Sequence, residues 1–170
     1  MLDSLTKALE EQVRDLYSAE TQLIKALPRM AKAATSESLR DAFTSHLEET
    51  HGQVERLQQI AEMLGVKPGG KKCKAMEGLI QEGKDLINGD GASSVRDAAL
   101  IASAQRVEHY EMASYGCVRT YARLLGDEES ANLLQMTLDE EADADEKLTE
   151  LAESSINVEA MESVSQEQLH

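Results

Sequence analysis

The chain has 170 residues, of which 41% are hydrophobic and only 3% aromatic, and its formal net charge at pH 7 is −15. This length suits one domain with a substantial core. A surface this acidic argues against nucleic acid and anionic membranes as partners. No apolar stretch approaches the ~20 residues of a membrane-spanning helix. Cys73 and Cys117 are not spaced like metal ligands. The first residues of the chain include several acids, whereas the central part of a signal peptide is apolar. We therefore expect a cytoplasmic protein with no membrane partner.

Apolar residues at helical spacing predict long helices over about residues 2–33, 38–64, 93–125 and 128–152. Gly65 and Gly126 stand where the second and third would end. The connection over residues 65–92 is long and contains a predicted short helix over about 76–87. Short, long and short connections predict an all-α four-helix bundle with one crossover. We assign residues 1–153 to this bundle and residues 154–170 to a polar acidic tail.

The fourth predicted helix shows an apolar stripe that carboxylates interrupt. The stripe consists of residues spaced alternately four and three apart, namely Leu134, Leu138, Glu141, Asp145, Leu148 and Ala152. Such spacing places all of them on one helix face. Two acids therefore stand where leucines are expected. A charge in a bundle core is costly unless it is paired or binds a metal.

Each predicted helix carries a similar interruption near its midpoint. The residues concerned are Glu20 in the first helix, Glu48 and His51 in the second, Glu108 and Glu111 in the third, and Glu141 and Asp145 in the fourth. Antiparallel packing would bring them to one level of the bundle. Without metal these carboxylates would repel one another and several would take up protons. Two divalent cations would offset that charge, and a set of carboxylates with one imidazole suits iron or manganese.

These residues resemble the ferritin-like di-iron carboxylate proteins, with a rubrerythrin-type arrangement of two glutamates in the third helix. More narrowly, the chain is similar to the YciF/YciE-type bacterial stress proteins. The segments that carry this similarity extend to about Ala152 and are DLYSAE, SHLEETHGQVERL, CKAMEGLI, VRDAALIASAQRVEHYEMASYG and TLDEEADADEKLTELA. The resemblance implies a ferritin-like bundle, a homodimer, a stress-related role and a dinuclear site.

The sequence departs from the di-iron pattern in the fourth helix. Those proteins usually have an ExxH motif in both the second and the fourth helix, whereas this chain has Asp145 one turn after Glu141 and no histidine there. Glu140 with Asp143 is the competing pair at spacing three, but both would point away from the stripe. Paired CxxC motifs are also missing, so a redox cycle would need an external reductant.

The hypothesis with the most support is a dinuclear iron or manganese centre that reacts with peroxide or dioxygen, as in a rubrerythrin-like peroxidase or oxidase, or that sequesters metal. Its expected bridging ligands are Glu48 and Glu141. Glu20 and Glu108 would be terminal ligands and His51 the nitrogen donor, with Glu111 and Asp145 completing the second metal site. The alternative is a metal-poor structural or interaction protein that keeps the same fold, and the missing second histidine favours it.

Overall fold

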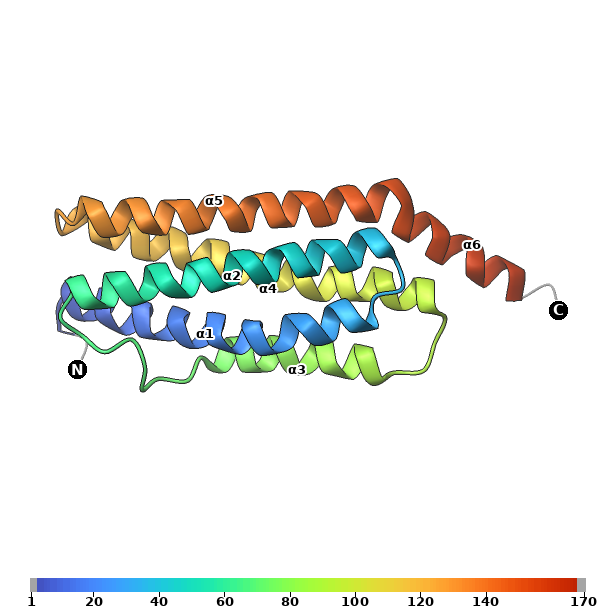
Figure 1. Cartoon of the computed structure of the whole chain (residues 1–170), viewed down its shortest axis with the longest axis horizontal. Helices are drawn as coiled ribbons and strands as arrows, with labels where there is room; N and C mark the ends of the chain where they lie inside the picture. Colours follow the sequence, from blue (N-terminus) through green and yellow to red (C-terminus); the bar gives the residue numbers. More distant parts are fainter. Residues whose placement is uncertain (1–2, 168–170) are drawn as a thin grey trace.

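Four long helices lie side by side in the structure, a computed structural model that describes residues 3–167 (Figure 1). They are α1 (Leu5–Ala33), α2 (Glu37–Met63), α4 (Ser93–Leu124) and α5 (Glu128–Leu151). Short connections join α1 to α2 and α4 to α5, and each of these pairs is an antiparallel hairpin. The hairpins pack through α1 against α4 and α2 against α5. The predicted all-α fold is confirmed.

The crossover between the hairpins contains α3 (Lys74–Asn88), which lies along the outside of α1 and α4. It carries the chain back along the bundle, so that α4 begins at the same end as α2 (Figure 1). One long crossover joining two short-linked hairpins is the connectivity of ferritin-like bundles. None of the helices in the described part of the chain is long and apolar enough to cross a membrane.

Side chains and glycines at the helix ends explain the boundaries. Ser4 and Ser36 accept hydrogen bonds from backbone N–H groups in the first turns of α1 and α2, and Asp127 does the same for α5. Gly65 and Gly126 have φ of 67° and 78°, in the left-handed region that glycine adopts without strain. Their N–H groups and those of the following residues bond back to the last turns of α2 and α4. α1 continues through the exposed Pro28.

The core consists of two apolar clusters with a polar layer between them. One cluster is built around Leu27, Phe43 and Leu100, and the other around Leu16, Ile60 and Val118. Along each long helix the buried residues change from apolar to charged and back to apolar, at Glu20, His46, Glu108 with Glu111, and Glu141. The fold therefore encloses acids from both hairpins at one level.

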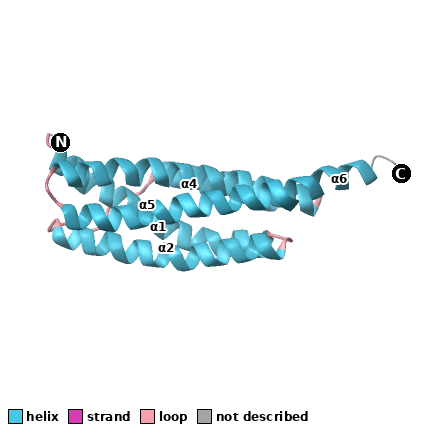
Figure 2. Ribbon diagram, turned by 90° about the horizontal axis from the view of Figure 1, so that it is seen from above, coloured by secondary structure: helices cyan, strands magenta, loops and turns pink. Residues whose placement is uncertain are grey.

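The expected tail from residue 154 is helical as far as the structure describes it. A π-helix (Ala152–Ile156) follows α5 directly and leads into α6 (Asn157–Glu167), which projects past the end of the bundle (Figures 1 and 2). Ala152 and Ile156 are buried in the apolar core, and α6 packs on α4. These contacts extend the folded part beyond residue 153. Residues 168–170 lie outside the described chain.

Candidate metal centre

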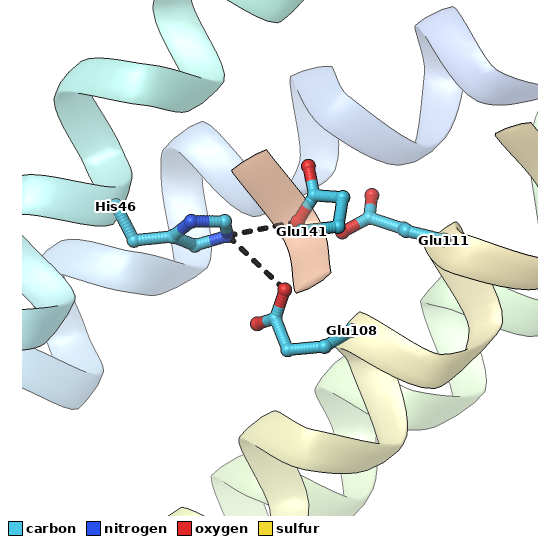
Figure 3. A group of neighbouring side chains, drawn as sticks. All are labelled: His46, Glu108, Glu111 and Glu141. Carbon is cyan, nitrogen blue, oxygen red and sulfur yellow. Dashed lines mark ion pairs between the residues drawn. The ribbon is translucent and has the colours of Figure 1, made fainter. Parts of the chain in front are cut away.

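Five ionisable side chains from all four long helices are buried together at the middle of the bundle. They are Glu20 of α1, His46 of α2, Glu108 and Glu111 of α4, and Glu141 of α5, and none exceeds 6% exposure. In Figure 3 the side chains of His46, Glu108, Glu111 and Glu141 point toward one another. Each of these four offers a ligand atom, and the four atoms all lie within 4.8 Å of one another. A group this compact can surround a metal ion.

His46 faces the carboxylates through its Nε2 atom. The distances from Nε2 are 3.6 Å to Glu108 Oε2 and 3.7 Å to Glu141 Oε2 (Figure 3). Both are longer than a hydrogen bond between nitrogen and oxygen. The atoms therefore surround a common space without being bonded directly to one another.

The buried ligand atoms lack hydrogen-bond partners among the described residues. These atoms are both carboxylate oxygens of Glu111 and of Glu141, one oxygen each of Glu20 and Glu108, and Nε2 of His46. Buried polar atoms are nearly always hydrogen-bonded in native proteins, because leaving one unpaired costs about 1–3 kcal/mol. Seven such atoms in one place could be satisfied by a bound cation, and divalent cations bind this kind of donor set.

Burial gives these carboxyl groups unusual acidity. Burial in the bundle, with the charge of Glu141 nearby, raises the pKa of Glu20 to about 8. Burial likewise raises the pKa of Glu108 to about 8, and the charges of Glu20 and Asp145 contribute to that rise. The pKa values of Glu111 and Glu141 are raised well above the ordinary value by burial and by neighbouring carboxylates. Metal-free protein at neutral pH therefore holds protons in this cluster, and binding a cation would release them.

Two groups outside the cluster orient its members. Tyr115, fully buried on α4, donates a hydrogen bond of 2.5 Å to Glu20 Oε1. Glu49 lies 3.4 Å from His46 Nδ1, and a proton on Nδ1 would leave the Nε2 lone pair facing the carboxylates. Although burial disfavours the imidazolium, the bond to Glu49 and the charge of Glu141 raise the pKa of His46. A carboxylate behind a histidine in this way is typical of metal sites.

A pocket of about 130 Å³ connects the cluster with the surface between α2 and α5. His46 and Glu108 form part of its wall and belong to the cluster as well. The rest of its lining is partly apolar, with Phe43 and Leu148, and partly charged, with Glu49, Asp143 and Lys147. The pocket gives a small molecule or an ion a path to the buried ligand atoms.

The structure brings together four of the seven residues singled out in the sequence, namely Glu20, Glu108, Glu111 and Glu141. It does not bring Glu48 and His51 to them, because both are exposed on the outer face of α2. The prediction that Glu48 and His51 lie on the buried face of this helix was therefore wrong. The buried face instead follows Leu39, Phe43, His46, Thr50, Gln53, Leu57 and Ile60.

His46 is the member of the cluster that the sequence did not predict. The spacing of the observed α2 face alternates four and three, as regularly as in the other helices. Three consecutive members of that face, His46, Thr50 and Gln53, are polar. An apolar pattern could therefore not identify the face, although a search for polar groups at the predicted level could have done so.

The remaining acids of the fourth predicted helix lie beside the cluster. Asp145 is partly buried, with Oδ2 at 3.3 Å from His109 Nε2 and with Oδ1 buried and unpartnered. Glu140 points away and accepts hydrogen bonds from Gln53 and Arg56. Asp143 is exposed and lines the pocket. Asp145 is thus the acid of this group best placed to contribute a ligand near Glu108.

A sequence family described as a domain of unknown function, DUF892, matches residues 4–161. The chain belongs to this family. It is 52% identical over 147 residues to Protein YciF of Escherichia coli strain K12, which covers 86% of this chain and 89% of YciF. The resemblance to YciF-type stress proteins is therefore confirmed.

Solved structures of related proteins share the fold of this DUF892 member. The crystal structure of the E. coli stress protein YciF matches with a TM-score of 0.88 and 48% identity, over 91% of this chain and 98% of that one. YcfI of Rhodopseudomonas palustris matches with a TM-score of 0.84 and 42% identity, over 87% of this chain and 94% of that one. A protein of Xanthomonas campestris pv. campestris, at 22% identity and a TM-score of 0.76 over 97% and 99% of the two chains, shares the fold.

Proposed function

We propose that this protein holds a dinuclear centre of divalent iron or manganese in its bundle core. The observation that carries the proposal is the set of buried ligand atoms without partners on Glu20, His46, Glu108, Glu111 and Glu141. Four ionised carboxylates with a neutral imidazole carry four negative charges, and two divalent cations would balance them. A single cation would balance only two of these charges, and the other two carboxyl groups would have to keep their protons. Charge balance thus favours two ions.

The hydrogen bonds of the carboxylates suggest different roles for them. Glu111 and Glu141 have both oxygens free, so that either could bridge two ions. Tyr115 occupies one oxygen of Glu20, which leaves that residue a single free oxygen and suits it to terminal ligation. His46 would supply the nitrogen donor in place of the expected His51. Oxygen donors with one imidazole match the preferences of iron and manganese better than those of softer metals.

A reduced metal pair would supply electrons for the reduction of peroxide or dioxygen. The chain's own residues contribute the surroundings of that chemistry. Leu16, Val118 and their apolar neighbours exclude water from one side of the cluster, and Phe43 and Leu148 line the path on the other. Tyr115 and Glu49 hold Glu20 and His46 in position. The cytoplasmic location, the homodimer and the external reductant stay predictions.

The alternative function is that of a metal-poor structural protein. The cluster contains a single histidine, and acids with raised pKa values can remain partly protonated without metal. The relative YcfI is itself described as a candidate structural protein. Metal content decides between these two functions.

The test is anaerobic loading with ferrous or manganous ion, followed by equilibrium dialysis and measurement of metal per chain. We expect two ions per chain in the wild-type protein, and rapid oxidation when peroxide is added to the ferrous form. His46→Gln should lose metal, whereas the matched His51→Gln on the exposed face of the same helix should not. A wild-type protein that retains almost no metal, or equal losses in both variants, would contradict the proposed centre.

A further inference from the structure

A groove between α1 and α3 gathers positive charge in a protein whose net charge is strongly negative. Its volume is about 290 Å³, and α3 lies against α1 on the outside of the bundle (Figure 1). Four of its lining residues are cationic, namely Lys25, Arg29, Lys72 and Lys84, and Glu77 is the single acid among them. The whole chain has 32 acidic and only 17 basic residues. A local excess of cations is therefore the opposite of what the composition favours.

Three of these cations have no partner within the described part of the chain. Lys25, Arg29 and Lys84 form neither an ion pair nor a side-chain hydrogen bond there, whereas Lys72 pairs with Glu77. Like charges that line one groove repel one another, and none of these three is offset by an ion pair. Such an arrangement contributes nothing to folding. It does supply free donors to an anion.

The cations are spread along the groove and do not converge on one point. Lys25 and Arg29 lie one turn apart on α1, about 6 Å along its axis. On the other wall Lys72 precedes the first turn of α3, and Lys84 lies about 15 Å along that helix. Gln22 and Gln81 lie beside them, with Ala26 and Ile80 between the walls. This spacing matches an extended anion with several charges better than a single phosphate.

We propose that the groove binds a linear oligophosphate, the chemistry shared by inorganic polyphosphate and nucleoside triphosphates. Arg29 and Lys84 face the anion from opposite walls and Lys25 extends the contact along α1. The rest of the acidic surface does not prevent this, because salt at physiological strength screens charges beyond about 8 Å. A long nucleic acid would have to pass over that acidic surface, and the groove therefore selects short anions. The site is separate from the proposed metal centre.

The experiment measures binding of tripolyphosphate and of ATP to the full chain by calorimetry, at about 0.15 M salt and in buffer free of divalent cations. We expect saturable binding that weakens as salt is added, because the contacts are ionic. Arg29→Ala with Lys84→Ala should weaken it by about tenfold or more. The matched control is Lys67→Ala with Arg123→Ala, which removes the same charge from exposed positions outside the groove and should leave affinity nearly unchanged.

Each outcome decides the proposal. Equal affinities for tripolyphosphate and ATP would identify the phosphate chain as the recognised group. A higher affinity for ATP would add a contact with the base or sugar. Both outcomes support an oligophosphate site. No saturable binding at that salt concentration, or equal weakening in the two double variants, would overturn it. A change of oligomeric state in Arg29→Ala with Lys84→Ala, without anion binding by the wild type, would show a contact between copies instead.

Discussion

Two kinds of buried carboxylate in this bundle differ in the hydrogen bonds that they accept. Asp97 of α4 is 3% exposed and accepts bonds from the N–H groups of Thr35 and Ser36 and from the Thr35 hydroxyl, at 2.7–3.1 Å. Glu111 and Glu141, equally buried, accept none among the described residues. Asp97 joins the α1–α2 connection to α4, and both of its oxygens already accept hydrogen bonds. Hydrogen-bond satisfaction, more than burial, therefore separates a structural acid from a candidate metal ligand.

The largest effect should follow from removing one unsatisfied carboxylate. We expect Glu141→Gln to abolish metal binding, because Glu141 lies beside both His46 and Glu108 and has two free oxygens. The metal-free variant should unfold at a higher temperature than metal-free wild type, since the cost of burying this carboxyl group, either protonated or charged, is gone. Dialysis and thermal unfolding measure the two effects. Glu48→Gln makes the same change on the exposed face of α2, and if it also abolished binding, the assigned cluster would be wrong.

Removing the hydrogen-bonded carboxylate of Asp97 should have the opposite result, a loss of stability without a loss of metal binding. Asp97→Ala should lower the free energy of unfolding by about 3 kcal/mol, because it leaves the buried N–H groups of Thr35 and Ser36 without their charged acceptor. Metal bound per folded chain should not change. Denaturant unfolding and metal analysis test both parts, with Asp41→Ala on the exposed face of α2 as control. If metal content fell with Asp97→Ala while the protein stayed folded, the division between the two kinds of acid would fail.

An intermediate effect is expected from Glu49, which contacts the cluster through His46. Glu49→Ala removes the carboxylate 3.4 Å from His46 Nδ1 and should weaken metal affinity about 10- to 100-fold without changing the number of ions bound. Competition with a chelator of known affinity measures this change. Glu55→Ala, an exposed acid of the same helix, serves as the control. An unchanged affinity in Glu49→Ala would show that the ring of His46 is oriented by packing alone.

The sequence predicted the fold and the cluster residues of three of the four long helices. The apolar residues around them explain why. In α1, α4 and α5 the acids of the cluster interrupt apolar runs, such as Leu9, Val13 and Leu16 in α1, and those runs determine the phase of the helix. In α2 the apolar residues near the cluster are too few to do so. The hydrogen bonds of Asp97 could not be predicted at all, because they join residues 62 positions apart in the chain.

The pH dependence of metal-free stability separates the two kinds of carboxylate without a mutation. Glu20 and Glu108 have folded-state pKa values of about 8 against an ordinary 4.5, so between these values the folded state binds more protons than the unfolded state. The free energy of unfolding therefore falls as pH rises through this range, by up to about 1.4 kcal/mol per pH unit for each extra proton bound. His46, whose pKa is also raised, acts in the same direction.

Denaturant unfolding of chelator-treated protein at a series of pH values between 5.5 and 8 measures this slope. Saturating metal should reverse it, because the ligands bind metal only after losing their protons and more metal binds as pH rises. Glu141→Gln should show a shallower slope than wild type, since one carboxyl with a raised pKa is gone. Asp97→Ala should keep the wild-type slope at a lower overall stability. A flat pH profile in the metal-free wild type would mean that the carboxyl groups of the cluster are satisfied in solution by water or a small rearrangement, and the contrast with Asp97 would then no longer identify a metal site.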